Sequence, residues 1–193
     1  MKVLGICGSL REDSNTNKLV KKVAESSGVD YELLYLSEYK IEPCTGCSMC
    51  IMNEGECVLQ DDMHVIYEKM LGTDAMIIGA PTYFFDISGA VKCFIDRMMA
   101  IFFRGIGTNY HTNMPWHGKR PHFGKPAVIL TTAAGEGHNR ALETLKFAMD
   151  DCTNMKIVAS MAEAVEMNDV DDLPDVLKRA EEAGKKLGQA LKG

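Results

Sequence analysis

Five apolar segments of strand length, separated by segments with helical periodicity, constrain the fold most strongly. The expected strands are residues 2–7, 31–36, 74–81, 126–132 and 155–160. Residues 2–7 are almost continuously apolar, which is typical of a strand that helices cover on both faces. Because right-handed crossovers connect parallel strands of this kind, the sequence predicts an α/β fold with a doubly wound, five-stranded parallel sheet and helices on both faces.

Helical patterns occupy most of the chain between and after these strands. They are expected to begin near Asn15 and to cover residues 63–71, 88–103, 139–151 and a tail beyond Asp171. The tail carries an apolar stripe formed by Leu173, Leu177, Ala180, Leu187 and Leu191. We expect this stripe to pack on the sheet, with a contact to another subunit as the alternative. With 193 residues and no internal repeat or linker, residues 1–193 are expected to form a single domain.

Charge and hydropathy exclude several classes of partner. The formal net charge is −6 and the basic residues are scattered, so neither nucleic acid nor an anionic membrane surface is an expected partner. No apolar run approaches the roughly 20 residues that span a bilayer, and the N-terminus lacks the zones of a secretory signal. A cytoplasmic location is therefore expected. In a reducing compartment, clustered thiols are more often metal ligands or redox groups than structural disulfides.

Three loops at the carboxyl ends of the expected strands have the composition of a binding site. Residues 8–16 place small and hydroxyl side chains ahead of a helix, where backbone N–H groups and Arg11 suit a phosphate. An ordinary helix cap at Ser14 or Asn15 is the alternative. Residues 81–85 combine proline, threonine and three aromatics, a wall suited to a planar heterocycle, and residues 131–137 are small enough for close backbone approach. Neither a Walker loop nor a G-x-G-x-x-G motif is present.

Four of the seven cysteines lie within one short segment. Cys44, Cys47, Cys50 and Cys57 occupy the predicted insertion at about residues 43–60. The other three cysteines fall in strand or helix patterns and are expected to be buried as small hydrophobic side chains.

Together, "GICGSLREDSNT", "APTYFFDISGAVKCFIDR", "TTAAGEG" and the cysteine segment resemble the flavodoxin-like NAD(P)H-dependent FMN reductases, and within them the iron-sulfur flavoproteins. The resemblance covers most of the chain. It implies that the first loop holds the FMN phosphate, the second lies along the isoalloxazine and the third borders its other side. The FMN-binding residues so implied are Ser9, Arg11, Ser14, Asn15, Thr16, Pro81, Thr82, Tyr83, Phe84, Phe85, Thr132, Ala133 and Gly135.

The cysteine spacing favours a [4Fe-4S] cluster. A cubane takes one thiolate per iron, and C-x-x-C-x-x-C lets three cysteines on a tight loop wrap it while Cys57 supplies the fourth ligand. Gly46 and Gly55 ease the turns that this requires. Zinc binding, redox-active thiols and the absence of any role are the alternatives.

The expected function is an FMN-dependent oxidoreductase that passes electrons between the cluster and FMN, with no acid–base triad. By resemblance, a ferredoxin-like protein or NAD(P)H is the expected donor, oxygen species or a quinone the acceptor, and a homodimer or homotetramer the assembly. The alternatives are an NAD(P)H-dependent FMN or quinone reductase without a cluster, and a zinc or thiol redox sensor. A long irregular loop at about residues 104–125 is expected to be a lid, a binding loop or an interface.

Overall fold

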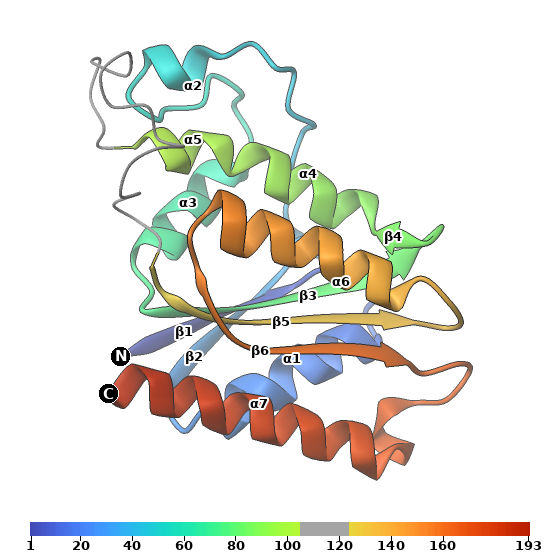
Figure 1. Ribbon diagram of the computed structural model, residues 1–193. Helices are drawn as coiled ribbons and strands as arrows, with labels where there is room; N and C mark the ends of the chain where they lie inside the picture. Colours follow the sequence, from blue (N-terminus) through green and yellow to red (C-terminus); the bar gives the residue numbers. More distant parts are fainter. Residues whose placement is uncertain (105–123) are drawn as a thin grey trace.

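A computed structural model describes residues 1–104 and 124–193. Most of the predicted irregular loop, with His111, Trp116, His117 and His122, lies outside the described residues. Within them, one parallel sheet has the strand order β2-β1-β3-β5-β6 (Figure 1). These strands are β1 (Lys2–Cys7), β2 (Asp30–Tyr35), β3 (Ala75–Tyr83), β5 (Pro126–Ala133) and β6 (Lys156–Ala164). The prediction of a doubly wound, flavodoxin-like sheet is confirmed.

A sixth, two-residue strand was not expected. β4 (Asp86–Ile87) pairs antiparallel with the end of β3 and forms a hairpin there. The strand order places β1 between β2 and β3, so the chain first extends the sheet to one side of β1 and then to the other. Ligands of open α/β sheets bind at such a switch point, beyond the carboxyl ends of the strands.

Helices cover both faces of the sheet (Figure 1). On one face lie α1 (Asn15–Ser26) and α7 (Pro174–Lys192), and on the other lie α3 (Met63–Leu71), α4 (Gly89–Arg97), α5 (Met99–Phe103) and α6 (His138–Lys146). Short turns of helix occur at η1 (Leu36–Glu38), α2 (Met49–Met52), η2 (Phe147–Cys152) and η3 (Val170–Asp172). None of the helices within residues 1–104 and 124–193 is both long and apolar enough to cross a bilayer.

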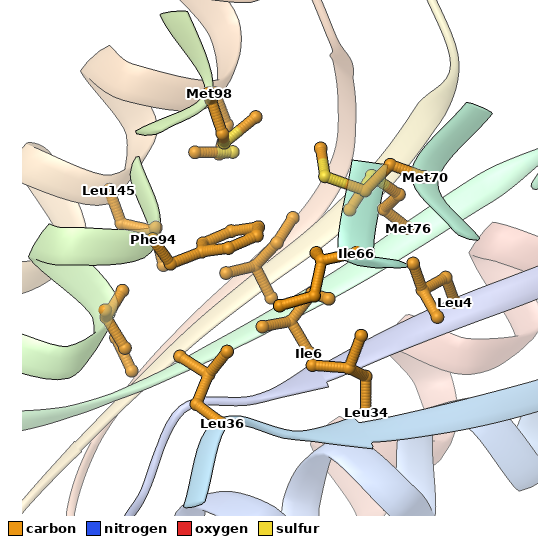
Figure 2. Packing of buried hydrophobic residues seen from close by; sticks show 14 of the residues in the cluster. Leu4, Ile6, Leu34, Leu36, Ile66, Met70, Met76, Phe94, Met98 and Leu145 are labelled. Carbon is orange, nitrogen blue, oxygen red and sulfur yellow. The ribbon is translucent and has the colours of Figure 1, made fainter. Parts of the chain in front are cut away.

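Successive side chains of each strand point to opposite faces of the sheet, so the sheet has a hydrophobic core on each face. In β1, Leu4 and Ile6 belong to the cluster under α3, α4 and α6, whereas Val3 and Cys7 belong to the cluster under α1 and α7. Figure 2 shows the first cluster, with Leu4, Ile6, Leu34 and Met76 from the strands near Ile66, Met70, Phe94 and Leu145 from the helices. Each large apolar side chain buried in this way contributes about 1.5–3 kcal/mol to folding.

The C-terminal stripe packs within the chain, as the sequence predicts. Ala180 and Leu187 are buried in the second cluster, and Leu173, Leu177 and Leu191 pack against it. Gly184 and Gly188 allow α7 to approach α1 closely, since a Cβ atom at these positions would lie 2.3 Å from the carbonyl oxygen of Val23 and 2.0 Å from that of Ser27.

Two predicted helices end earlier than expected. The helix predicted over residues 88–103 divides into α4 and α5 at Met98. The Tyr67 hydroxyl donates a 2.6 Å hydrogen bond to the carbonyl of Arg97. This carbonyl lies where α4 ends. The helix predicted over residues 139–151 is α-helical only to Lys146 and continues as the π-helical turn η2.

Candidate functional site

A cavity of about 400 Å³ lies at the carboxyl edge of the sheet. Its lining comes from the loops that follow β1, β3, β5 and β6: Arg11, Asn15, Thr16, Pro81, Thr82, Tyr83, Thr132, Ala133, Ala134, Val165, Glu166, Met167 and Asn168. In Figure 1 this is the edge to which the β5 and β6 arrows point. The three loops singled out in the sequence therefore meet, joined by a fourth.

The first loop contains two residues that hold the loop itself in place. Ser14 caps α1, because its Oγ accepts a 3.1 Å hydrogen bond from the backbone N–H of Asn17. The Asn17 side chain in turn bonds the backbone N–H and carbonyl of Ser9. Ser9 and Ser14 are buried and do not line the cavity. The capping interpretation is thus confirmed for Ser14, and a direct FMN contact of either residue stays a prediction.

The other predicted residues of the first loop face the cavity. The Thr16 and Thr132 hydroxyls lie 2.6 Å apart and connect the first loop to the third. The Asn15 amide donates to the carbonyl of Asn168 at 2.8 Å, which ties the first loop to the fourth. Arg11 forms no ion pair within the described residues. Its guanidinium charge, beside the N-terminus of α1, suits an anion.

The second loop divides into a lining part and an exposed part. Pro81, Thr82 and Tyr83 line the cavity, and the Thr82 Oγ1 atom is buried and has no hydrogen-bond partner among the described residues. A buried hydroxyl in this state is available to a ligand. Phe84 and Phe85 are 96% and 58% exposed and are outside the lining. Both have positive φ, at 47° and 68°, in the two-residue turn between β3 and β4. Bulky residues rarely adopt this conformation.

The third and fourth loops complete the site. Thr132 and Ala133 line the cavity as predicted, whereas Gly135 lies in an exposed turn outside the lining. The residues that the sequence analysis missed are Ala134, Val165, Glu166, Met167 and Asn168. The last four directly follow the carboxyl end of β6, so the rule that selected the first three loops would also have selected this one.

A charged cluster fixes the fourth loop beside the first. The Lys18 ammonium lies 2.5 Å from Asp169, 3.1 Å from Asp13 and 3.2 Å from Asp171. The hydrogen bond from Lys18 holds the pKa of Asp169 below its ordinary value. These ion pairs are partly exposed, so each contributes little to stability, but together they join the two rims of the cavity.

The cysteine segment lies apart from this cavity, above α4 and α5 in Figure 1. Cys44 and Cys47 are exposed, whereas Cys50 and Cys57 are half-buried and pack against the core of Figure 2. Burial raises the pKa of the Cys50 thiol, and the nearby charges of Cys57, Cys44 and Cys47 raise it further.

The turns of this segment use both of its glycines. Gly46 and Gly55 have φ angles of +66° and +90°, as the predicted turns require. A Cβ atom at Gly55 would lie 2.5 Å from the Cα atom of Arg104, so the segment packs tightly on the end of α5 there. Of the remaining cysteines, Cys7 is buried and Cys93 is half-buried.

The donor set fits an iron-sulfur cluster in type and number, with four thiols in one segment. In residues 1–104 and 124–193, no group of three or more His, Cys, Asp or Glu side chains is arranged to hold a metal ion. The thiols are thus gathered without forming a coordination shell. This is common for metal sites, whose ligands take their final positions when the metal binds.

The sequence profile of the NADPH-dependent FMN reductases matches residues 1–169. The chain belongs to this family. An iron-sulfur flavoprotein of Methanocaldococcus jannaschii is 39% identical over 100 residues, covering 50% of this chain and 51% of that protein. An iron-sulfur flavoprotein of Archaeoglobus fulgidus is 39% identical over 102 residues, covering 51% and 46%. This member of the family thus spans about half the length of these curated relatives.

The fold of this family member also matches solved structures. A flavone reductase superimposes with a TM-score of 0.74 at 21% identity, covering 100% of this chain and 63% of that one. At this identity, the similarity establishes the shared flavodoxin-like fold.

Proposed function

We propose that this protein is an FMN-dependent oxidoreductase whose flavin occupies the four-loop cavity. The observation that carries the proposal is the cavity itself, which lies at the switch point of the sheet in a chain of the FMN reductase family. Arg11 and the N-terminus of α1 suit the phosphate of FMN. Pro81, Tyr83 and the small residues Thr132 to Ala134 offer flat walls to the ring, and the Thr82 hydroxyl is free to bond it.

We further propose that Cys44, Cys47, Cys50 and Cys57 hold a [4Fe-4S] cluster. The four clustered thiols and the names of the relatives support this assignment. When bound, such a cluster carries one electron at a time and FMN accepts one or two, so the pair joins a one-electron donor to a two-electron acceptor. The chain then has to position both groups and shield them from water, and needs no acid–base triad.

The partners proposed for this reaction follow from the family. NAD(P)H or a ferredoxin-like protein is the proposed donor, and oxygen species or a quinone the proposed acceptor, in a cytoplasmic homodimer or homotetramer. Exposed apolar side chains close to the cavity support an assembly or an apolar acceptor. Tyr83, Phe84, Phe85 and Met167 are between 47% and 96% exposed. A strictly monomeric mass in solution would contradict the proposed assembly.

The test is the visible spectrum of anaerobically purified protein, with FMN, iron and acid-labile sulfide quantified on the same sample. One FMN with about four irons and four sulfides per chain is the expected result. Absence of flavin would refute the assignment of the cavity, and zinc without flavin would instead support a metal or thiol sensor.

The second candidate is an NAD(P)H-dependent FMN or quinone reductase without a cluster. The exposure of Cys44 and Cys47 favours it. FMN without iron, together with rapid bleaching of the flavin by NADPH, would establish this alternative.

A further inference from the structure

Arg97, at the C-terminal end of α4, is a buried charge whose contacts lead to the cysteine segment. Its side chain and that of Asp61 are each only 1% exposed, and their ion pair has N···O distances of 2.5 and 3.0 Å. A buried ion pair is weak evidence for stability, because desolvation of both charges offsets most of their attraction. Stability alone therefore does not explain why this ion pair is buried here.

The remaining contacts of Arg97 indicate another role. Its Nη2 atom lies 3.4 Å from the Sγ atom of Cys57, and its Nη1 atom donates a 2.8 Å hydrogen bond to the carbonyl of Glu42. One guanidinium thus bonds Glu42, just before residues 43–60, and Asp61, just after them. Lysine could not reproduce this set of contacts, because its donors all sit on one nitrogen and cannot pair bidentately with a carboxylate while also reaching Glu42 and Cys57.

The two ends of the segment are also joined to each other. Asp61 accepts a 2.8 Å hydrogen bond from the backbone N–H of Glu42. Lys40 and Asp62 exchange two more bonds, from the Lys40 N–H to the Asp62 carboxylate at 2.7 Å and from the Asp62 N–H to the Lys40 carbonyl at 3.1 Å. Arg97 and Asp61 therefore close the base of a loop that carries all four thiols.

The same helix connects this base to the cavity. α4 has nine residues, which corresponds to a length of about 13 Å. Before its first residue, the backbone N–H of Ser88 donates to the carbonyl of Pro81, which lines the cavity. After its ninth residue, Arg97, the helix ends, and α5 begins at Met99. α4 is thus a short rigid connection with the proposed flavin site at one end and Arg97 at the other.

We propose that Arg97 is a positioning residue for the cysteine segment: paired with Asp61, it fixes Cys57 and closes the base of the loop that receives the cluster. The inference rests on the proposed cluster and adds a residue outside the cysteine motif. Its Nη2–H group, 3.4 Å from the Cys57 sulfur, is placed to donate a hydrogen bond to the thiolate that Cys57 would contribute. Partners of this kind orient metal ligands and tune the bound metal.

The experiment compares Arg97→Lys with the wild-type holoprotein. A second variant, Arg97→Met with Asp61→Asn, removes both charges, so that no unpaired charge is left in the core if Arg97→Lys fails to fold. Arg179→Lys is the control, because Arg179 on α7 makes a two-bond pair with Glu163 on β6, and α7 covers the face of the sheet opposite to α4. For each protein, the measurements are FMN per chain, the rate at which a chelator removes iron, and the reduction potential of the cluster.

The proposal predicts that the Arg97 variants keep one FMN per chain but lose iron about 10- to 100-fold faster than wild type. Their cluster potential falls, since a hydrogen-bond donor near a ligating sulfur stabilises the reduced form. The control behaves as wild type. Wild-type iron release and potential in both folded variants would overturn the proposal. Parallel loss of FMN and iron in both would also overturn it, because the pair would then support the whole fold.

A further readout separates this inference from the cluster assignment. If the wild-type protein contains no iron, the cluster proposal fails, but hydrogen exchange of iron-free protein still tests the base of the loop. Faster exchange over residues 40–62 in Arg97→Lys, with α7 unchanged, is the expected result. Identical exchange in both proteins would refute the positioning role.

Discussion

The cavity at the sheet edge and the cysteine segment are both candidate cofactor sites, but they are built differently. The cavity is formed by loops at the ends of buried parallel strands, whose register fixes where each loop begins. The cysteine segment contains only the four-residue helix α2, and Cys44 and Cys47 are exposed. The comparison indicates that the proposed flavin site is preorganised by the backbone. The proposed cluster site is held instead by a few side-chain contacts, and its ligands would take their final positions on binding a metal.

The largest expected effect is the loss of iron without loss of FMN when one thiol is replaced. Cys50→Ser removes a proposed ligand from the segment, and we expect iron to fall to background while FMN stays at one per chain. Metal and flavin analysis of anaerobically purified protein is the measurement. Cys93→Ser, a half-buried cysteine outside the segment, is the control and should keep both groups. Iron retained at the wild-type level in Cys50→Ser would show that this thiol is no ligand.

Thr16→Val should have the opposite effect, weaker binding of FMN with no loss of iron. The change removes the hydroxyl that bonds Thr132 between two loops of the cavity and leaves that partner unsatisfied. Such a loss costs roughly 1–3 kcal/mol, so we expect the Kd for FMN to rise by about tenfold or more with iron content unchanged. Thr73→Val is the matched control, because this buried hydroxyl lies at the opposite edge of the sheet. Equal weakening by both changes would contradict the assignment.

Two glycines allow a finer test of how the cysteine segment is held. Gly46→Ala and Gly55→Ala both place a side chain at positive φ, a strain of roughly 1–2 kcal/mol. Only Gly55 is in addition packed against the backbone of Arg104, whereas no atom of the described residues lies within 4 Å of a Cβ atom placed at Gly46. We therefore expect chelators to remove iron faster from Gly55→Ala than from Gly46→Ala. Equal rates would indicate that packing on α5 does not position the segment.

The smallest expected effect is on the dependence of stability on pH. Burial acts to raise the pKa of Asp61, but hydrogen bonds from Arg97 and from the backbone hold it below its ordinary value. A carboxyl with a lowered folded pKa stabilises the protein above its unfolded pKa, and this contribution is lost as the pH falls below about 4.

Urea unfolding between neutral and acidic pH measures this contribution. The free energy of unfolding of wild type should fall more steeply below about pH 4 than that of the Arg97→Met, Asp61→Asn variant. Parallel curves would mean that the ion pair contributes no pH-dependent stability.

The fold and the cavity loops are predictable from the sequence because both follow from local patterns, although only three of the four loops were selected. Apolar runs mark the buried strands, and loops at their carboxyl ends meet by topology. The exposure of Phe84 and Phe85 was not predictable, since two-residue turns with positive φ normally use asparagine or glycine.

The pairing of Arg97 with Asp61 was not predictable either. The two residues are separated by 36 positions, and the sequence alone shows only an arginine inside a predicted helix and an aspartate after the cysteines. Burial and a shared partner in Glu42 become visible only when α4 is placed beside the base of the segment.

The central claim is that electrons pass between the cysteine segment and the cavity. It is tested most directly by anaerobic rapid mixing of wild type and Cys50→Ser with a one-electron reductant, and separately with NADPH, while flavin absorbance is followed. We predict that the variant's flavin is reduced far more slowly than wild type by the one-electron reductant and at the wild-type rate by NADPH. Equal rates with the one-electron reductant would show that the flavin takes electrons independently of the cysteines, and would contradict the account.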